Sequence, residues 1–201
     1  MKAVSLETAL FVFALLPRAR LRIKIVPMPI KIMTPLLVLL SAFGPAFAQS
    51  SRQQSPEAFA ARFYRTYLRL KVNGLPDAKQ FKALSPLLSP DLRQLFEDAK
   101  REQEKFIKEN PDEKPPWIEG DLFTSLFEGA QSFKVGSSQA RGEYREVPVR
   151  LQYRTGKEVT RWSDTLVLAR TKTGWQVWDI LLKGEWQFKQ GGSLRDILKA
   201  R

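Results

Sequence analysis

The large apolar residues between positions 59 and 70 recur every three or four residues, with arginines beside them. This spacing places the apolar side chains on one face of an α-helix. Just before the pattern, Ser55-Pro56-Glu57 supplies an N-cap, a first-turn proline and a first-turn acid. The pattern therefore predicts a helix that begins after Ser55, runs to about Val72 and stops at Asn73-Gly74.

A second helical pattern follows the first. Apolar residues clustered at 81–88 predict a short helical turn, and Ser89-Pro90-Asp91 repeats the start signal for a longer helix. The second half of this helix is highly charged, with opposite charges three or four residues apart, as in Glu97 and Arg101. We expect this half to present a solvated face, and Asn110-Pro111 to end the helix.

The pattern changes from helical to alternating after residue 129. Before the change comes a proline-rich loop at 111–120, and Asp121 is predicted to cap a short apolar segment that ends at Glu128-Gly129. Four strands are then predicted, at about 131–135, 145–154, 159–170 and 175–182, with a closing helical turn at 194–199. Tight connections join the last three strands, so they should form an antiparallel meander. This order predicts an α+β domain, with N-terminal helices packed on one face of a curved antiparallel sheet.

The chain carries the pattern of a cleavable secretory signal before the first helix. Lys31 precedes the apolar run 34–43, and Ala46-Phe47-Ala48 supplies small residues at the positions that a signal peptidase reads. The run is shorter than the roughly 20 residues that cross a bilayer, which favours cleavage after Ala48 over a permanent anchor. We therefore expect a periplasmic or secreted protein.

Residues 1–27 do not fit this pattern, because a second apolar run at 9–16 is followed by four basic residues. The interpretation we favour is a start assigned too far upstream, with translation beginning at Met28 or Met33. A long n-region and a two-segment membrane hairpin are the alternatives. The predicted organisation is a signal peptide with its extension at 1–48, a disordered leader at 49–54 and a single domain at 55–201.

Cleavage changes the charge of the protein. The whole chain has 33 basic and 21 acidic residues and a net charge of +12, of which residues 1–48 hold six bases and one acid. The mature chain keeps the other 27 bases and 20 acids, so its net charge is +7. Both signs are interspersed along every segment, which favours a solvated basic surface over nucleic-acid binding. Attraction to an anionic membrane surface or to an acidic partner stays open.

Cysteine and histidine are both absent from the sequence. Disulfides, thiolate nucleophiles, zinc sites built from these residues and a histidine general base are therefore excluded. Catalysis would have to use carboxylates, Tyr, Lys, Arg or an oxygen-ligated metal. No cofactor and no metal site are predicted.

Four segments carry a family resemblance: 121–136 (DLFTSLFEGAQSFKVG), 162–164 (WSD), 174–180 (GWQVWDI) and 192–196 (GSLRD). Together they resemble a family of bacterial exported domains of unknown function with the nuclear-transport-factor-2-like fold. The resemblance implies a cone-shaped, cystatin-like curved sheet wrapped around a helix-lined pocket, and it brings no agreed activity. In enzymes of this fold a pocket carboxylate or a His with Asp pair transfers the proton, and this chain lacks the histidine.

Strand parity predicts which side chains face the interior. A tight turn at 171–174 predicts three cross-strand pairs: Arg170 with Trp175, Leu168 with Val177, and Leu166 with Asp179. This register puts Trp162 and Asp164 on the same inner face as Trp175 and Asp179. The parity therefore predicts two aspartates among apolar and aromatic neighbours.

A two-residue connection before the third predicted strand would add Arg145 to this face, opposite Leu166, with Val149 opposite Trp162. The predicted ligand-binding residues are Arg145, Trp162, Asp164, Trp175 and Asp179. Desolvated carboxylates have shifted pKa values, as ligand-orienting and proton-transferring sites do. The alternative is structural, because buried carboxylates need partners: a satisfied ion pair, or backbone-capping aspartates that fix the sheet.

The opposite face of the predicted sheet also carries apolar residues: Val167, Ala169, Trp178, Ile180 and Leu182. Such a patch needs a cover. A homodimer through this open face is one interpretation. Burial by the proline-rich loop, or by the C-terminal segment around Trp186 and Phe188, is the other.

These observations favour a non-enzymatic, exported binding module for an unknown small ligand or exported protein. An alternative is a carboxylate-based hydrolase, isomerase or dehydratase that uses Asp164 or Asp179. A third hypothesis is an inhibitor or immunity-type partner of another exported protein.

Overall fold

The computed structural model describes residues 54–185 and 192–199. The predicted signal peptide, most of the predicted leader, Trp186 and Phe188 lie outside the described residues. None of the helices in the described part has the length and apolarity that a membrane span requires.

Helix α1 (Pro56–Leu70) begins where the sequence predicts. The Oγ of Ser55 accepts a hydrogen bond from the Ala58 amide at 3.1 Å, which satisfies one of the free donors of the first turn. The helix ends before the predicted Val72, because Lys71 takes a left-handed conformation with φ 49° and closes the last turn.

Helix α2 (Ala78–Leu84), a 3-10 turn η1 (Ser85–Leu87) and helix α3 (Pro90–Glu109) follow. A capping box between Asp77 and Gln80 starts α2, and Ser89 caps α3 as predicted. The short helical turn and the longer helix are thus confirmed.

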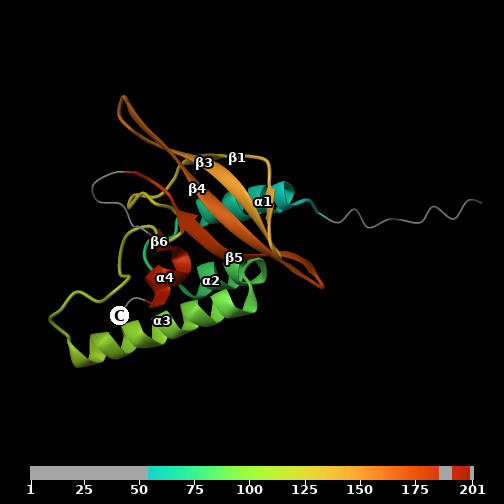
Figure 1. Cartoon of the computed structure of the whole chain (residues 1–201). Helices are drawn as coiled ribbons and strands as arrows, with labels where there is room; N and C mark the ends of the chain where they lie inside the picture. The colour runs from blue at the N-terminus through green and yellow to red at the C-terminus, as the bar shows by residue number, and fades with distance from the viewer. Residues whose placement is uncertain (1–53, 186–191, 200–201) are drawn as a thin grey trace, which may run out of the picture. The chain divides into compact units, whose positions relative to one another are not determined.

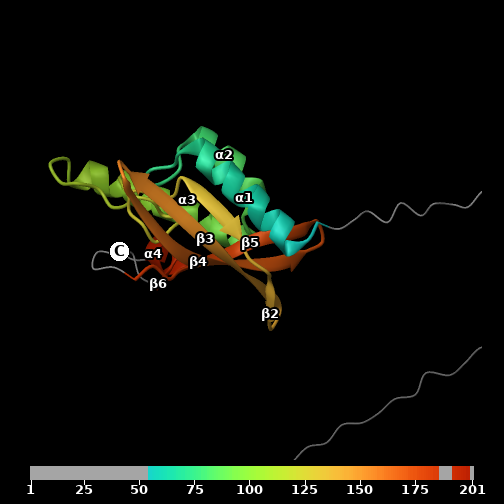
Figure 2. The ribbon, with the colours of Figure 1, turned by 90° about the horizontal axis from the view of Figure 1, so that it is seen from above.

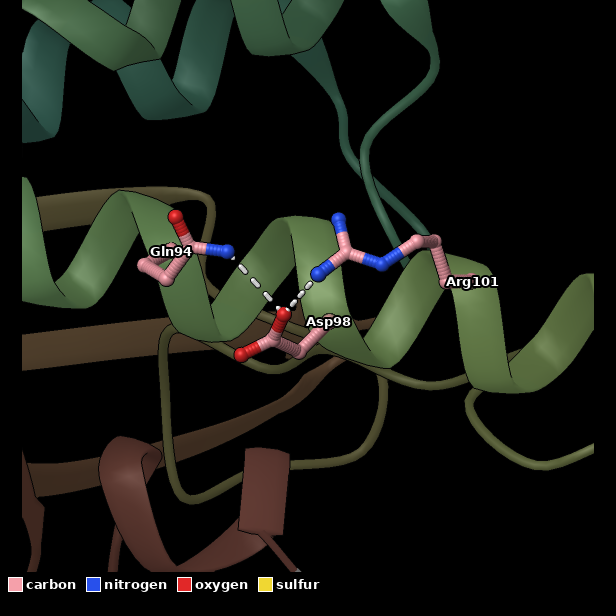
Figure 3. Close-up of polar contacts among 3 residues, drawn as sticks. All are labelled: Gln94, Asp98 and Arg101. Carbon is pink, nitrogen blue, oxygen red and sulfur yellow. Dashed lines mark hydrogen bonds and ion pairs between the residues drawn. The ribbon is translucent and has the colours of Figure 1, made fainter.

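The charged half of α3 is exposed, with a different pairing from the predicted one. Asp98 accepts a hydrogen bond from the Gln94 side chain at 3.0 Å and forms an ion pair with Arg101, so the partner of Arg101 is not Glu97 (Figure 3). The side chains of Asp98 and Arg101 are half or more exposed, so this pair contributes little to stability. Asp98 and Arg101 neutralise one another.

The sheet has six antiparallel strands: β1 (Ser132–Val135), β2 (Gln139–Arg141), β3 (Tyr144–Thr155), β4 (Glu158–Thr171), β5 (Gly174–Leu182) and β6 (Gly192–Ser193). Their order is β1-β3-β4-β5-β6, with β2 also paired to β3. The four predicted strands and the closing helix α4 (Leu194–Lys199) are present. The sequence missed β2 and β6, which have only three and two residues and no alternating pattern.

The α+β class is confirmed, and the sheet is strongly twisted (Figure 1). Helices α1 and α2 lie on one side of the sheet in Figure 2. The core forms where α1 packs on β1 and β3, and its largest fully buried side chains include Phe59, Phe63 and Tyr64 of α1. Helix α3 is fixed at the edge of β5, because the Ser89 amide donates to the Val177 carbonyl at 2.8 Å.

One bulge changes the predicted faces of β5. Leu168 does pair with Val177, but the register shifts next to it, so that Leu166 pairs with Ile180 and Asp179 pairs with Val167. The predicted pairing of Leu166 with Asp179 is therefore wrong. A one-residue shift exchanges the two faces of a strand, so Asp179 moves to the outer face and Ile180 moves into the core.

The bulge also removes part of the predicted outer apolar patch. Ile180 and Leu182 belong to the core, with exposures of 0% and 4%. Trp178, the extra residue of the bulge, packs against the Tyr144 ring with centroids 4.6 Å apart, and the Arg195 guanidinium lies 4.6 Å from the Trp178 ring. Residues of β3 and α4 thus provide the cover at this position.

The register of the hairpin formed by β3 and β4 differs by two residues from the predicted register. Its loop, Gly156-Lys157, places Thr155 opposite Glu158, so Val149 lies opposite Asp164 and Arg145 opposite Leu168. The predicted partners, Trp162 for Val149 and Leu166 for Arg145, are wrong. A shift of two residues preserves the face, so Asp164 still lies on the core side.

Candidate functional site

Asp164 is the most deeply buried of the predicted ligand-binding residues, with an exposure of 0%. Its carboxylate accepts hydrogen bonds from the backbone amides of Ser125 and Lys183, both at 2.9 Å, and from the Trp162 indole at 3.0 Å. The Ser125 hydroxyl donates a fourth. This carboxylate therefore joins the loop before β1 to the end of β5, as a satisfied buried anion must.

Asp179 lies on the other face of the sheet, because of the β5 bulge. Its Oδ1 accepts from the amide of Ile180 at 2.8 Å and from the amide of Arg195 at 3.0 Å, in the first turn of α4. Burial raises the pKa of Asp179 above its ordinary value, and the hydrogen bond from the Arg195 amide opposes the rise. The residue links β5 to α4.

Trp175 and Arg145 are placed away from both aspartates. The Trp175 indole donates to the Gln54 carbonyl at 3.0 Å, and Arg170 lies 4.7 Å from the Trp175 ring. Arg145 is half-buried opposite Leu168. The five predicted residues thus do not surround one cavity in the described part of the chain. Among the five, Trp162 alone borders one of the hollows discussed below, the hollow across β1, β3 and β4.

A third buried carboxylate, Asp121, forms a pair with Tyr67 that the sequence did not predict. Asp121 has an exposure of 4%; its Oδ2 accepts from the Tyr67 hydroxyl and its Oδ1 from the Phe123 amide at 2.7 Å. The bond to the Phe123 amide confirms that Asp121 caps the following turn. Burial raises the pKa of Asp121 from 3.8 to about 7, against the opposing effect of these hydrogen bonds.

The backbone packs closely over this pair. A side-chain carbon at Gly129 would lie 2.6 Å from Asp121 Oδ2, so only glycine fits there. A surface hollow of about 550 Å³ reaches Asp121 and Tyr67, with Phe127, Glu128 and Tyr153 also in its wall. Tyr67 and Asp121 are 54 positions apart, so no local motif could have identified the pair.

An apolar cleft of about 570 Å³ lies between α2 and α3. We call it the α2–α3 cleft. Its walls are formed by Leu75, Pro76, Ala78, Phe81, Pro86 and Phe96. Three basic residues, Lys82, Arg93 and Lys100, and one acidic residue, Glu97, stand around it.

The rim of the α2–α3 cleft is electrostatically unbalanced. Among the described residues, no ion pair involves Lys82, Arg93 or Lys100. This contrasts with the neighbouring Asp98–Arg101 pair on the same helix. An apolar hollow with unpaired cations at its edge can hold the apolar body of a ligand and attract a negatively charged head.

Comparisons with known proteins do not assign a function. No protein-family model matches the chain, and no curated protein is similar to it. Two solved structures are similar, each 17% identical with a TM-score of 0.38. One is a SEC-C motif containing protein from Rhodopseudomonas palustris, covering 65% of this chain and 80% of that one. The other is a type VI effector-immunity complex from Ralstonia pickettii, covering 67% of this chain and 100% of the matched one. Both TM-scores are too low to assign a fold family.

Proposed function

We propose that this protein is an exported binding module whose α2–α3 cleft holds a small amphipathic anion. One observation carries the proposal: an apolar hollow whose rim has three cations, Lys82, Arg93 and Lys100, against the single acid Glu97. The volume of about 570 Å³ lies within the range of small-molecule sites, roughly 300–1,000 Å³. The ligand class is an apolar chain or ring that bears a carboxylate, sulfate or phosphate.

The apolar wall and the basic rim of the cleft would contribute to binding in different ways, and both favour this ligand class. Apolar contact with Leu75, Phe81 and Phe96 contributes about 25 cal/mol for each Å² of ligand surface removed from water. The rim cations add attraction for an anionic head and repel a cationic one. Charge at the rim therefore sets the sign of the ligand, and apolar area sets most of the affinity.

The proposal also includes the domain family and the cellular location of this module, and both rest on the sequence. The four segments that resemble the nuclear-transport-factor-2-like family support a cone-shaped domain of that family. The signal pattern supports cleavage after Ala48 and release into the periplasm or outside the cell. N-terminal sequencing of the exported protein should give Gln49 first. A mature protein that retains the residues before Met33 would contradict the proposed export.

The enzymatic alternative has less support from the two aspartates on which it was based. The carboxylates of Asp164 and Asp179 both accept bonds from backbone amides, which favours the structural interpretation. Their oxygens hold loops and helix ends together. A ligand-orienting role would instead need oxygens directed into a cavity.

Isothermal titration with decanoate tests the proposed function, and decyltrimethylammonium serves as a ligand with the same chain and the opposite charge. Ala78→Trp fills the cleft with an indole, whereas Ala83→Trp makes the same change at an exposed position of α2 outside the cleft. We expect decanoate to bind the wild type and Ala83→Trp alike, and Ala78→Trp at least about tenfold more weakly. The cationic ligand should bind the wild type more weakly than decanoate. Equal affinities for the two variants, or for the two head groups, would contradict the proposal.

A further inference from the structure

Strands β1, β3 and β4 lie side by side in the sheet (Figure 1). A second hollow lies across these three strands, on the outer face of the sheet. Its volume is about 430 Å³. The side chains of the outer face that line it are Ser132, Lys134, Arg150, Gln152, Arg161 and Ser163. We call this surface the basic groove, because it contains three cations and no acid.

The cations of the basic groove are close together and exposed. Lys134 lies directly opposite Arg150 in the β1–β3 ladder, and Arg161 lies diagonally from Arg150 in the β3–β4 ladder. Among the described residues, none of the three forms an ion pair. Like charges placed opposite each other across strands destabilise a sheet. The arrangement therefore opposes folding and needs an explanation outside the fold.

Protection of a sheet edge does not explain these charges. Basic residues on edge strands prevent association with other sheets. Arg150 and Arg161, however, belong to β3 and β4, which are interior strands in the order β1-β3-β4-β5-β6. Their exposure on the face of the sheet, rather than at its edge, indicates a surface that meets an anion.

We propose that the basic groove binds an acidic, extended segment of a partner protein. The cations are distributed over three strands, about 10 Å in all at the usual strand separation, and do not converge on one point. Acidic side chains two positions apart in an extended segment are spaced by about 7 Å, which matches charges spread in this way. Arginine also binds carboxylates through two parallel hydrogen bonds.

Other occupants of the basic groove fit less well. Single-stranded nucleic acid needs aromatic side chains on which bases stack, but Trp162 is buried and Phe133 packs on Tyr64 with ring centroids 5.5 Å apart. A membrane would favour exposed apolar anchors, and the exposed large apolar residues of the described part, Ile107, Ile118 and Phe127, lie outside the groove. A symmetric homodimer through this face would bring the three cations toward their own copies.

Fluorescence anisotropy with a labelled ten-residue peptide of alternating glutamate and serine tests the proposal. The double variant Arg150→Ser, Arg161→Ser is compared with Lys105→Ser, Lys108→Ser, which removes the same charge from the exposed end of α3. We expect the groove variant to lose at least about tenfold in affinity and the control variant less than about threefold. Because the groove cations repel one another, the groove variant should melt no lower than the wild type, so misfolding will not explain the loss.

Two further ligands test whether the basic groove prefers nucleic acid or a membrane surface to the acidic peptide. An oligothymidine of ten nucleotides and phosphatidylglycerol vesicles are offered under the same conditions. Absence of peptide binding, equal losses in both variants, or a preference for the oligonucleotide or the vesicles would overturn the proposal. Decanoate should bind both double variants with wild-type affinity, so the result here is independent of the proposed α2–α3 cleft function.

Discussion

The buried carboxylate of Asp121 should make folding stability fall as the pH rises through neutrality. In the folded protein burial raises its pKa from 3.8 to about 7. Between these two values the folded protein keeps a proton that the unfolded chain has released, so the unfolding free energy decreases with pH. The contribution is fully present below about pH 4 and is lost as the pH rises through 7. A difference of about three pKa units corresponds to about 4 kcal/mol.

Urea unfolding followed by tryptophan fluorescence, from pH 4 to pH 8, measures this effect in the wild type and in Asp121→Asn. The difference between the two proteins isolates Asp121, because other shifted groups titrate in both. Glu57 has a pKa lowered to about 2 by hydrogen bonds with Ser138, so its contribution is lost only as the pH falls below about 4.5. Asp179, whose pKa is raised by burial, contributes in the same direction as Asp121.

We expect the difference in unfolding free energy between wild type and Asp121→Asn to change by about 4 kcal/mol between pH 4 and pH 8. The change should favour the variant at the higher pH, where the wild type holds a buried charge. Parallel stability curves for the two proteins would refute the assignment of a raised pKa to Asp121. A change of the opposite sign would show that hydrogen bonds from Tyr67 and Phe123 outweigh its burial.

Three further predictions concern stability and are checked by urea unfolding at pH 7. Asp164→Asn should lose about 2–4 kcal/mol, because the amide cannot accept from all four donors; unchanged stability would contradict its structural role. Gly74→Ala should lose about 2 kcal/mol or more, because φ is 70° and the new methyl would overlap the Trp117 carbonyl. Gly156→Ala, at φ 56° in open space, should lose only about 1 kcal/mol, and equal losses would exclude the overlap. Tyr64→Phe should stay within about 0.5 kcal/mol of the wild type, since the buried hydroxyl has no partner in the described part. Tyr67→Phe, which removes the bond to Asp121, should lose about 1–2 kcal/mol, and the reverse order would be inconsistent with these contacts.

The helix starts could be predicted because their causes are local. Ser55 caps α1 through an amide three residues away, and Ser89 caps α3 in the same way. Strand positions and the α+β order followed from alternation over whole segments. These signals act within a few residues of the chain, so a single sequence contains them.

The β5 bulge could not be predicted, because its contacts come from distant parts of the chain. Trp178, the extra residue of the bulge, contacts the Tyr144 ring of β3 and the Arg195 guanidinium of α4. Alternation alone cannot reveal an inserted residue, and every face assignment beyond it changes. The separation of Asp164 from Asp179 follows from this one residue.

The α2–α3 cleft could not be predicted from the sequence, for a different reason. Phe81 and Phe96 lie in segments that the sequence correctly marks as helical, and apolar helix positions normally face the core. Their ring centroids lie 6.1 Å apart between α2 and α3, and both residues line the cleft. A helical pattern fixes which side of each helix is apolar but not how closely the two helices approach.

Chemical-shift mapping by NMR with decanoate tests the central claim most directly, because it reports which surface the ligand contacts. The account predicts saturable shifts of the Leu75 and Ala78 methyl groups and of the Phe81 ring, which line the α2–α3 cleft. Resonances of Tyr153, in the hollow beside Asp121, should stay unchanged. Absence of saturable shifts, or shifts confined to the surroundings of Tyr153, would contradict the proposed site.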